Sequence, residues 1–172
     1  MDISQPNPIE NKVAASGLVT LNLEDYFHSG ERVLFDIKPW LFMEMILKEK
    51  DFRLHVKEHD WSSYSGKNVA FICSVDAIIP TWAYMLLAVH IEPYANRYVF
   101  GDLALLNTVL YQDALAKIEV ETFRDARVIV KGCGDLPVPV SAYVEITHKL
   151  APVAKSIMYG EACSNVPIFK KK

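Results

Sequence analysis

The sequence predicts an α/β protein: a single domain with a mostly parallel central sheet of about five strands and helices on both faces. Short β-branched runs alternate along the chain with longer segments of helical period. The predicted strands are almost continuously apolar, as expected of strands covered on both faces. A chain of 172 residues with 51% hydrophobic content can bury one substantial core. We therefore expect a flexible N-terminal arm over residues 1–16 and one α/β domain over residues 17–172.

Five strands are predicted, all of them after residue 16. Residues 1–16 are polar and contain two prolines, so the regular structure is expected to begin after them. The segments "LVTLNL" and "NVAFICS" show the enrichment in β-branched and apolar residues that is typical of buried strands. The predicted strands cover residues 18–23, 51–57, 68–74, 97–101 and 126–132.

Four helices are predicted between and after these strands. Trp82, Met85, Leu86 and Val89 recur at the spacing of one helical face, and Pro80 suits a first-turn position. Asp102 can accept hydrogen bonds from the first free amides of the next helix, and Pro152 is expected to kink or end the last helix near residue 150. The predicted helices cover residues 38–49, 80–92, 102–117 and 139–158.

Composition argues against several classes of protein. The net charge is −3, and the only basic cluster, Lys170 to Lys172, is too small to track a nucleic acid backbone. The most apolar window, residues 78–91, is shorter than the ~18 to 20 residues of a membrane span. No secretory signal is visible at the start of the chain. The sequence thus predicts a cytoplasmic protein that binds neither nucleic acid nor membrane.

The three cysteines are the strongest candidates for chemistry. An odd number of cysteines in a reducing compartment argues for metal binding, catalysis or packing rather than a disulfide framework. Cys73 ends one apolar strand, and Cys133 follows another between two glycines. If these strands share a parallel sheet, both thiols point into the crevice at its carboxyl edge. Cys163 lies in a C-terminal loop that could fold over the same edge.

Carboxylates follow the same strands. Asp76 lies beyond Cys73, Asp102 follows the strand at 97–101, and Asp135 lies beyond Cys133. Three thiolates with Asp76 or Asp102 as a fourth ligand would suit zinc or an iron–sulfur cluster. We expect the glycines beside Cys133 to let backbone amides approach its sulfur.

Each of these residues can also have a simpler, structural role. A buried cysteine such as Cys73 can be an inert small hydrophobe, whereas Gly-Cys-Gly is a poor way to fill a core. Asp76 and Asp102 can be helix caps instead of ligands. The sequence has no CxxC or HExxH motif for a metal, and no GxGxxG, GxxxxGK[ST] or GxSxG motif for a nucleotide or a serine nucleophile.

Several blocks of sequence resemble a known family. The blocks "CSVDAIIPTWAYML", "VFGDL", "VIVKGCGDLPVP" and "VAKSIMYGEACSNVPI" resemble an uncharacterised bacterial family, domain-of-unknown-function family 2480, over residues 12–169. That family has no established activity. The resemblance implies an association with the sulfur-mobilisation system of iron–sulfur cluster assembly, and it assigns no residue roles.

A second, partial likeness concerns zinc. The segment "CSVDA" after one strand and "CG" after another are similar to the zinc-site pattern of β-class carbonic anhydrases, which uses Cys, His and Cys with an Asp-Arg pair. The chain departs from this pattern, because Ala77 or Ile78 occupies the arginine position and no histidine precedes Cys133 closely. The likeness therefore illustrates how strand ends can hold zinc.

Three functions remain open from the sequence. The first is a metal-binding accessory protein with zinc or an iron–sulfur cluster and with iron–sulfur assembly proteins as partners. The second is an enzyme whose zinc-activated water attacks a small carbonyl-type substrate. The third is an interaction subunit without metal, with the apolar segment "YVFGDLALLNTVLYQ" hinting at a homodimer.

Overall fold

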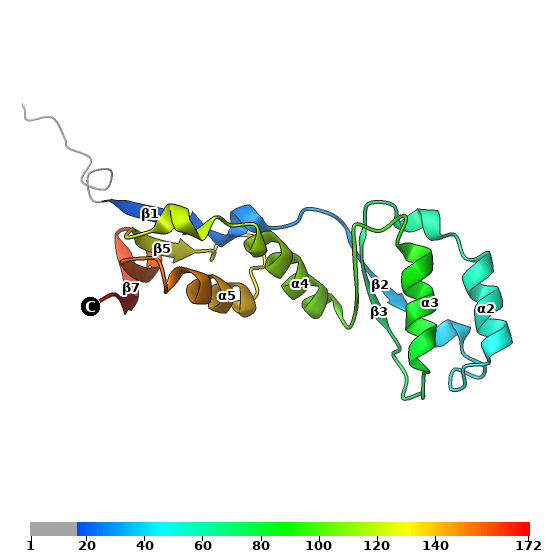
Figure 1. The fold of residues 1–172 in the computed structure, drawn as a ribbon. Coiled ribbons are helices and arrows are strands. Elements are labelled where there is room, and N and C mark those ends of the chain that lie inside the picture. Colours follow the sequence, from blue (N-terminus) through cyan, green and yellow to red (C-terminus); the bar gives the residue numbers. More distant parts are fainter. Residues whose placement is uncertain (1–16) are drawn as a thin grey trace, which may run out of the picture. The chain divides into compact units, whose positions relative to one another are not determined.

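The α/β class is confirmed by the computed structural model, which describes residues 17–172 (Figure 1). The predicted arm over residues 1–16 lies outside the described residues. The strands are β1 (Leu18–Asn22), β2 (Arg32–Asp36), β3 (Asn68–Ile72), β4 (Arg97–Phe100), β5 (Arg127–Lys131), β6 (Ser156–Glu161) and β7 (Ser164–Lys170). The α-helices are α2 (Glu49–Glu58), α3 (Thr81–Ile91), α4 (Leu103–Ala116) and α5 (Val140–Leu150), and short 3-10 turns lie between them.

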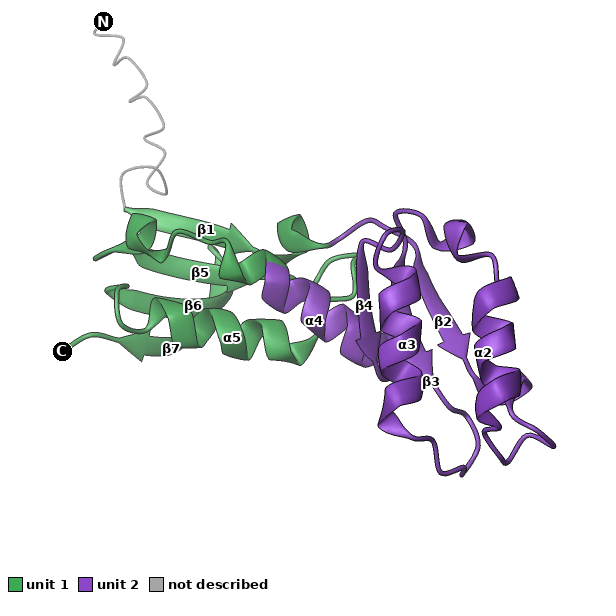
Figure 2. Ribbon diagram, turned by 45° about the vertical axis from the view of Figure 1, so that its right-hand side comes forward, with its two compact units in different colours: residues 1–27, 114–172 green, residues 28–113 purple. Residues whose placement is uncertain are grey.

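The strands form two sheets, so the prediction of one central sheet is wrong. One sheet has the order β1-β5-β6-β7 and the other has the order β2-β3-β4. The chain accordingly divides into two compact units, coloured separately in Figure 2. Of the described residues, unit 1 comprises 17–27 and 114–172, and unit 2 comprises 28–113. The strand count of an α/β chain does not say which strands pair, because pairing depends on contacts between distant segments.

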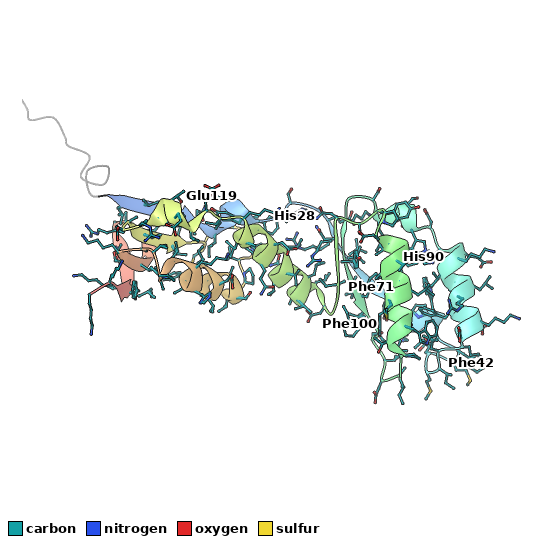
Figure 3. All side chains as sticks on the ribbon, viewed as in Figure 1. His28, Phe42, Phe71, His90, Phe100 and Glu119 are labelled. Atoms are coloured by element: carbon teal, nitrogen blue, oxygen red, sulfur yellow. The ribbon has the colours of Figure 1, made fainter. Side chains whose placement is uncertain are left out.

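Unit 2 is a three-stranded parallel sheet with helices on both faces. Val69 and Phe71 point to one face of β3, where they join a core with residues of α2 and α3; Figure 3 shows Phe71 beside α3. Ala70 points to the other face and packs against Leu106 and Leu110 of α4. The alternation of side chains along β3 thus explains why this strand is apolar throughout.

Unit 1 is a four-stranded mixed sheet. Strands β1, β5 and β6 are parallel, and β7 returns antiparallel to β6 as a hairpin. Helix α5 forms the crossover between β5 and β6, and its buried face consists of Ala142, Ile146 and Leu150 at helical spacing. The parallel order brings the carboxyl ends of β1, β5 and β6 to one edge of this sheet.

Two predicted elements are wrong. The segment 51–57 is helix α2, not a strand: Phe52, Leu54 and Val56 alternate in sequence, but only Phe52 and Val56, four residues apart, are buried. The predicted helix over 38–49 contains one short 3-10 turn, Lys38–Trp40, and then a tight turn in which Met43 and Glu44 have positive φ. Strands β2, β6 and β7 were not expected from the sequence.

Helices α3 and α4 confirm their predictions closely, whereas α5 is eight residues shorter at its C-terminal end than the helix predicted over 139–158. Helices α3 and α4 differ from the predicted bounds by one residue at each end. Asp102 caps α4, since its carboxylate accepts a hydrogen bond of 2.7 Å from the Leu105 amide. Helix α5 ends at Leu150, two residues before Pro152. Within residues 17–172 no helix combines the length and the apolar character needed to cross a membrane.

Candidate functional site

The candidate site lies at the carboxyl edge of the sheet of unit 1. Strands β1, β5 and β6 end there at Asn22, Lys131 and Glu161, and Cys133 follows β5 by two residues. A cavity of about 180 Å³ opens at this edge. Ligands of open α/β sheets gather at such edges. The cavity is lined by Asn22, Glu24, Lys131, Gly132, Cys133, Gly134, Gly160 and Glu161.

The Cys133 thiol is exposed and lies between two tyrosine hydroxyls. Its Sγ atom is 2.6 Å from the Tyr159 hydroxyl and 3.9 Å from the Tyr143 hydroxyl. Tyr159 is positioned by the pairing of β6 with β5, in which it lies opposite Val130. Tyr143 comes from the first turn of α5, and the two rings meet edge to face with centroids 5.8 Å apart.

Both hydroxyls are held in the protonated form. Burial, followed by the hydrogen bond to Cys133, raises the pKa of the Tyr143 hydroxyl above its ordinary value. The hydrogen bond to Cys133 is the main cause that raises the pKa of Tyr159. At neutral pH each phenol therefore carries a proton that it can donate to a thiolate, and charge-assisted hydrogen bonds of this kind are the stronger ones.

The two glycines beside Cys133 make room for two side chains. A Cβ atom on Gly132 would lie 2.7 Å from the Tyr143 hydroxyl and 3.1 Å from the Cβ of Leu23. A Cβ atom on Gly134 would lie 2.5 Å from the carboxylate of Glu24, to which the Gly134 amide donates a hydrogen bond. We expected these glycines to bring backbone amides to the sulfur; instead Gly132 admits a tyrosine, and the Gly134 amide binds a carboxylate.

Cys73 occupies a different environment in unit 2. Its side chain is half-buried against the core of that unit, and its thiol donates to the Val75 carbonyl at 3.4 Å. The neighbouring Ser74 binds Asp36 through its amide and its hydroxyl. Cys73 and Cys133 follow strands of two different sheets, so the premise that they share one sheet edge is wrong.

The remaining predicted ligands are Asp76, Asp102 and Cys163, and Asp135 is a further carboxylate near Cys133. Asp102 acts as the cap of α4. Asp76 is exposed and does not cap α3, which begins after Pro80. Asp135 is exposed in the turn after Cys133. Cys163 is exposed in the turn between β6 and β7, which puts it at the same sheet edge as Cys133, as expected.

The predicted metal ligands do not form a set that fits zinc or a cluster. In the part of the chain from residue 17 onward, no group of three or more His, Cys, Asp or Glu side chains lies close enough to hold a metal ion. All three cysteines are free thiols. The donors that the structure gathers around Cys133 are hydroxyl groups, which suit a thiolate better than they suit a metal.

Sequence reasoning missed both tyrosines. Tyr159 falls one residue beyond the predicted helix 139–158, so its place within strand β6 was not recognised. Tyr143 was expected only as part of a helix. The position of Glu24 beside Gly134 depends on the fold of the turn, which leaves space for its carboxylate.

The comparisons with known proteins yield one family. No curated protein and no solved structure matches the chain, so the partial likeness to β-class carbonic anhydrases gains no support. A family model described as "Protein of unknown function (DUF2480)" matches residues 7–171. Because this match covers nearly the whole sequence, the chain belongs to the DUF2480 family of proteins of unknown function.

Proposed function

We propose that this protein is a thiol-dependent group-transfer enzyme or carrier whose nucleophile is Cys133. One observation carries the proposal: the exposed Cys133 sulfur is within hydrogen-bond reach of two tyrosine hydroxyls, at the sheet edge where α/β proteins bind their ligands. The proposed setting is the reducing cytoplasm, where a free thiol stays available.

The proposed chemistry begins at the thiolate. Thiolates are strong nucleophiles, and protonated Tyr143 and Tyr159 can stabilise the negative charge on sulfur by donating to it. The sulfur attacks an electrophilic atom of the substrate, forms a covalent bond to it and expels a leaving group, which departs with the bonding electron pair. A second acceptor then takes the group and restores the free thiol.

The test is the reactivity of the three cysteines in the native protein. We expect iodoacetamide at pH 7 to alkylate Cys133 at least roughly ten-fold faster than Cys163, because a hydrogen bond to a charged group contributes about 1.5 to 3 kcal/mol. Peptide mapping by mass spectrometry after timed quenching gives each rate. Cys163 is a matched reference because it is also exposed at this edge.

The Tyr159→Phe variant provides the control for the mechanism. It should slow the alkylation of Cys133 by at least roughly ten-fold and leave Cys163 unchanged, since only the hydroxyl in contact with Cys133 is lost. Equal rates for Cys133 and Cys163 in the native protein would contradict the proposal.

Metal binding is the second proposal. Cys133 is exposed, and its sulfur is a soft metal ligand. The carboxylate of Glu24 accepts a hydrogen bond from the amide of the next residue, Gly134. Because the described residues hold no set of three ligands, a metal ion or cluster would be a cargo shared with a second protein. Iron–sulfur assembly proteins are the partners that this proposal names.

Elemental and sulfide analysis of the complex formed anaerobically with a cluster-loaded iron–sulfur assembly protein tests this second proposal. Binding through Cys133 predicts metal in the native protein and in Cys73→Ser, and its loss in Cys133→Ser. Cys73→Ser is the matched control because Cys73 belongs to the other sheet. Metal content that is the same in both variants would contradict a role for Cys133 as ligand.

A further inference from the structure

An apolar cavity of about 310 Å³ lies beside the Cys133 thiol. It shares two walls with the thiol site, because Tyr143 and Tyr159 both line it and both reach the sulfur with their hydroxyls. Its volume is at the lower end of the ~300 to 1,000 Å³ of small-molecule pockets. The other lining residues are Val130, Val140, Thr147, Ile157, Met158 and Ile168.

The polar groups of this cavity wall are already engaged. The Thr147 hydroxyl donates to the Tyr143 carbonyl at 2.7 Å, and the two tyrosine hydroxyls face the Cys133 sulfur. Val130 and Ile157 are buried, whereas Val140 and Ile168 are exposed. The surface left for a ligand consists of apolar side-chain atoms. A polar or charged group of a ligand would therefore lose its hydration in this cavity without gaining hydrogen bonds.

We infer that the substrate of this site is a thioester of a short aliphatic acyl group, whose chain occupies the apolar cavity while its carbonyl carbon meets the Cys133 sulfur. This inference rests on the proposed function, because it names the substrate class of the same thiol. An acyl chain fits better than a sugar or a phosphate, since the cavity offers neither charge nor free hydrogen-bonding groups.

The chemical step is a thiol–thioester exchange. The Cys133 thiolate attacks the carbonyl carbon, a new sulfur–carbon bond forms, and the sulfur–carbon bond to the leaving thiol breaks. The leaving thiolate departs with the electron pair of that bond. No oxidant or reductant is needed. As the sulfur forms the new bond it loses its negative charge, so a tyrosine hydroxyl that donated to the thiolate can donate to the carbonyl oxygen, on which negative charge develops.

A series of acyl donors tests the inference. We expect acetyl, butanoyl and hexanoyl thioesters of N-acetylcysteamine to acylate Cys133 with increasing rate constants, by roughly two- to four-fold per added methylene, until the cavity is full. Intact-mass spectrometry of the full chain follows the reaction, and peptide mapping locates the acyl group. Rate constants that do not depend on chain length, or that fall from acetyl onward, would overturn the inference.

Two tryptophan variants of α5 provide the matched pair. Val140 lines the cavity and is 78% exposed, while Val144, one turn later, is 66% exposed and does not line it. Val140→Trp should lower the ratio of the hexanoyl to the acetyl rate by roughly ten-fold, the effect of losing about two buried methylenes. Val144→Trp should leave this ratio unchanged. Equal ratios in the two variants would overturn the assignment of the chain to this cavity.

The failure of this inference differs from the failure of the proposed function. If Cys133 reacts rapidly with iodoacetamide and with the acetyl donor but shows no chain-length preference, only the acyl-chain inference is overturned. If Cys133 reacts no faster than Cys163 with iodoacetamide and with the acetyl donor, the proposed function is overturned. The acyl-chain inference is then overturned as well.

Discussion

Replacing Gly132 with valine is expected to slow the alkylation of Cys133 at pH 7 by more than roughly ten-fold. Even the first added carbon would lie 2.7 Å from the Tyr143 hydroxyl and 3.1 Å from Leu23, which is fully buried. The branched side chain must therefore displace Tyr143 and shift the turn that carries the thiol, and a hydrogen bond to a charged group is typically worth about 1.5 to 3 kcal/mol. Overpacking of this kind also costs about 1 to 3 kcal/mol of stability.

The reactivity of Cys163 in the same sample serves as the internal reference for this variant. Unfolding would change both cysteines, whereas a local shift changes Cys133 alone. A double-mutant cycle with Tyr143→Phe separates the steric effect from the loss of the hydroxyl. If Gly132→Val leaves the rate ratio of Cys133 to Cys163 unchanged, the space that Gly132 provides is not needed for the thiol site.

Replacing Phe52 with alanine is expected to lower the free energy of unfolding of unit 2 by about 3 to 5 kcal/mol. Phe52 on α2 is fully buried, and its ring lies edge to face with Trp40 and Trp82 at centroid distances of 5.7 and 5.9 Å. Removing the ring deletes a large apolar surface and leaves a cavity among aromatic side chains that cannot close around it.

Tryptophan fluorescence during urea unfolding measures this effect in unit 2 alone. The chain has three tryptophans, Trp40, Trp61 and Trp82, and all of them lie within residues 28–113. Leu54→Ala is the matched control on the same helix, because Leu54 is 51% exposed and should cost less than about 1 kcal/mol. If the two variants lower the free energy of unfolding equally, Phe52 is not the residue through which α2 packs against the core of unit 2.

The glycines around Cys133 have a specific structural role. A Gly-Cys-Gly turn in a chain with few cysteines can serve the backbone alone, but here each glycine lies against a side chain beside the thiol, Tyr143 or Glu24. Substituting either glycine would force that neighbour to move even if the backbone kept its conformation. The turn thus presents the thiol together with a hydroxyl and a carboxylate.

The limits of sequence-based prediction are clearest in two segments. In residues 51–57 three apolar side chains alternate and predict a strand, yet the buried pair Phe52 and Val56 follows helical spacing. The difference depends on which side chain the rest of unit 2 covers, and that information is not local. Likewise, Tyr159 could be assigned to the thiol site only after β6 was seen to pair with β5.

By itself the sequence determined the α/β class, helices α3 and α4, and the placement of a glycine-flanked thiol after a buried strand. These features are read from periodicity and turn residues within short windows, so local physics is sufficient. Only the tertiary structure decided that the strands divide into two sheets and that Tyr143 and Tyr159, 10 and 26 residues from Cys133, meet at its sulfur. Such contacts arise from strand pairing and helix packing between distant segments, whose partners no short window of sequence specifies.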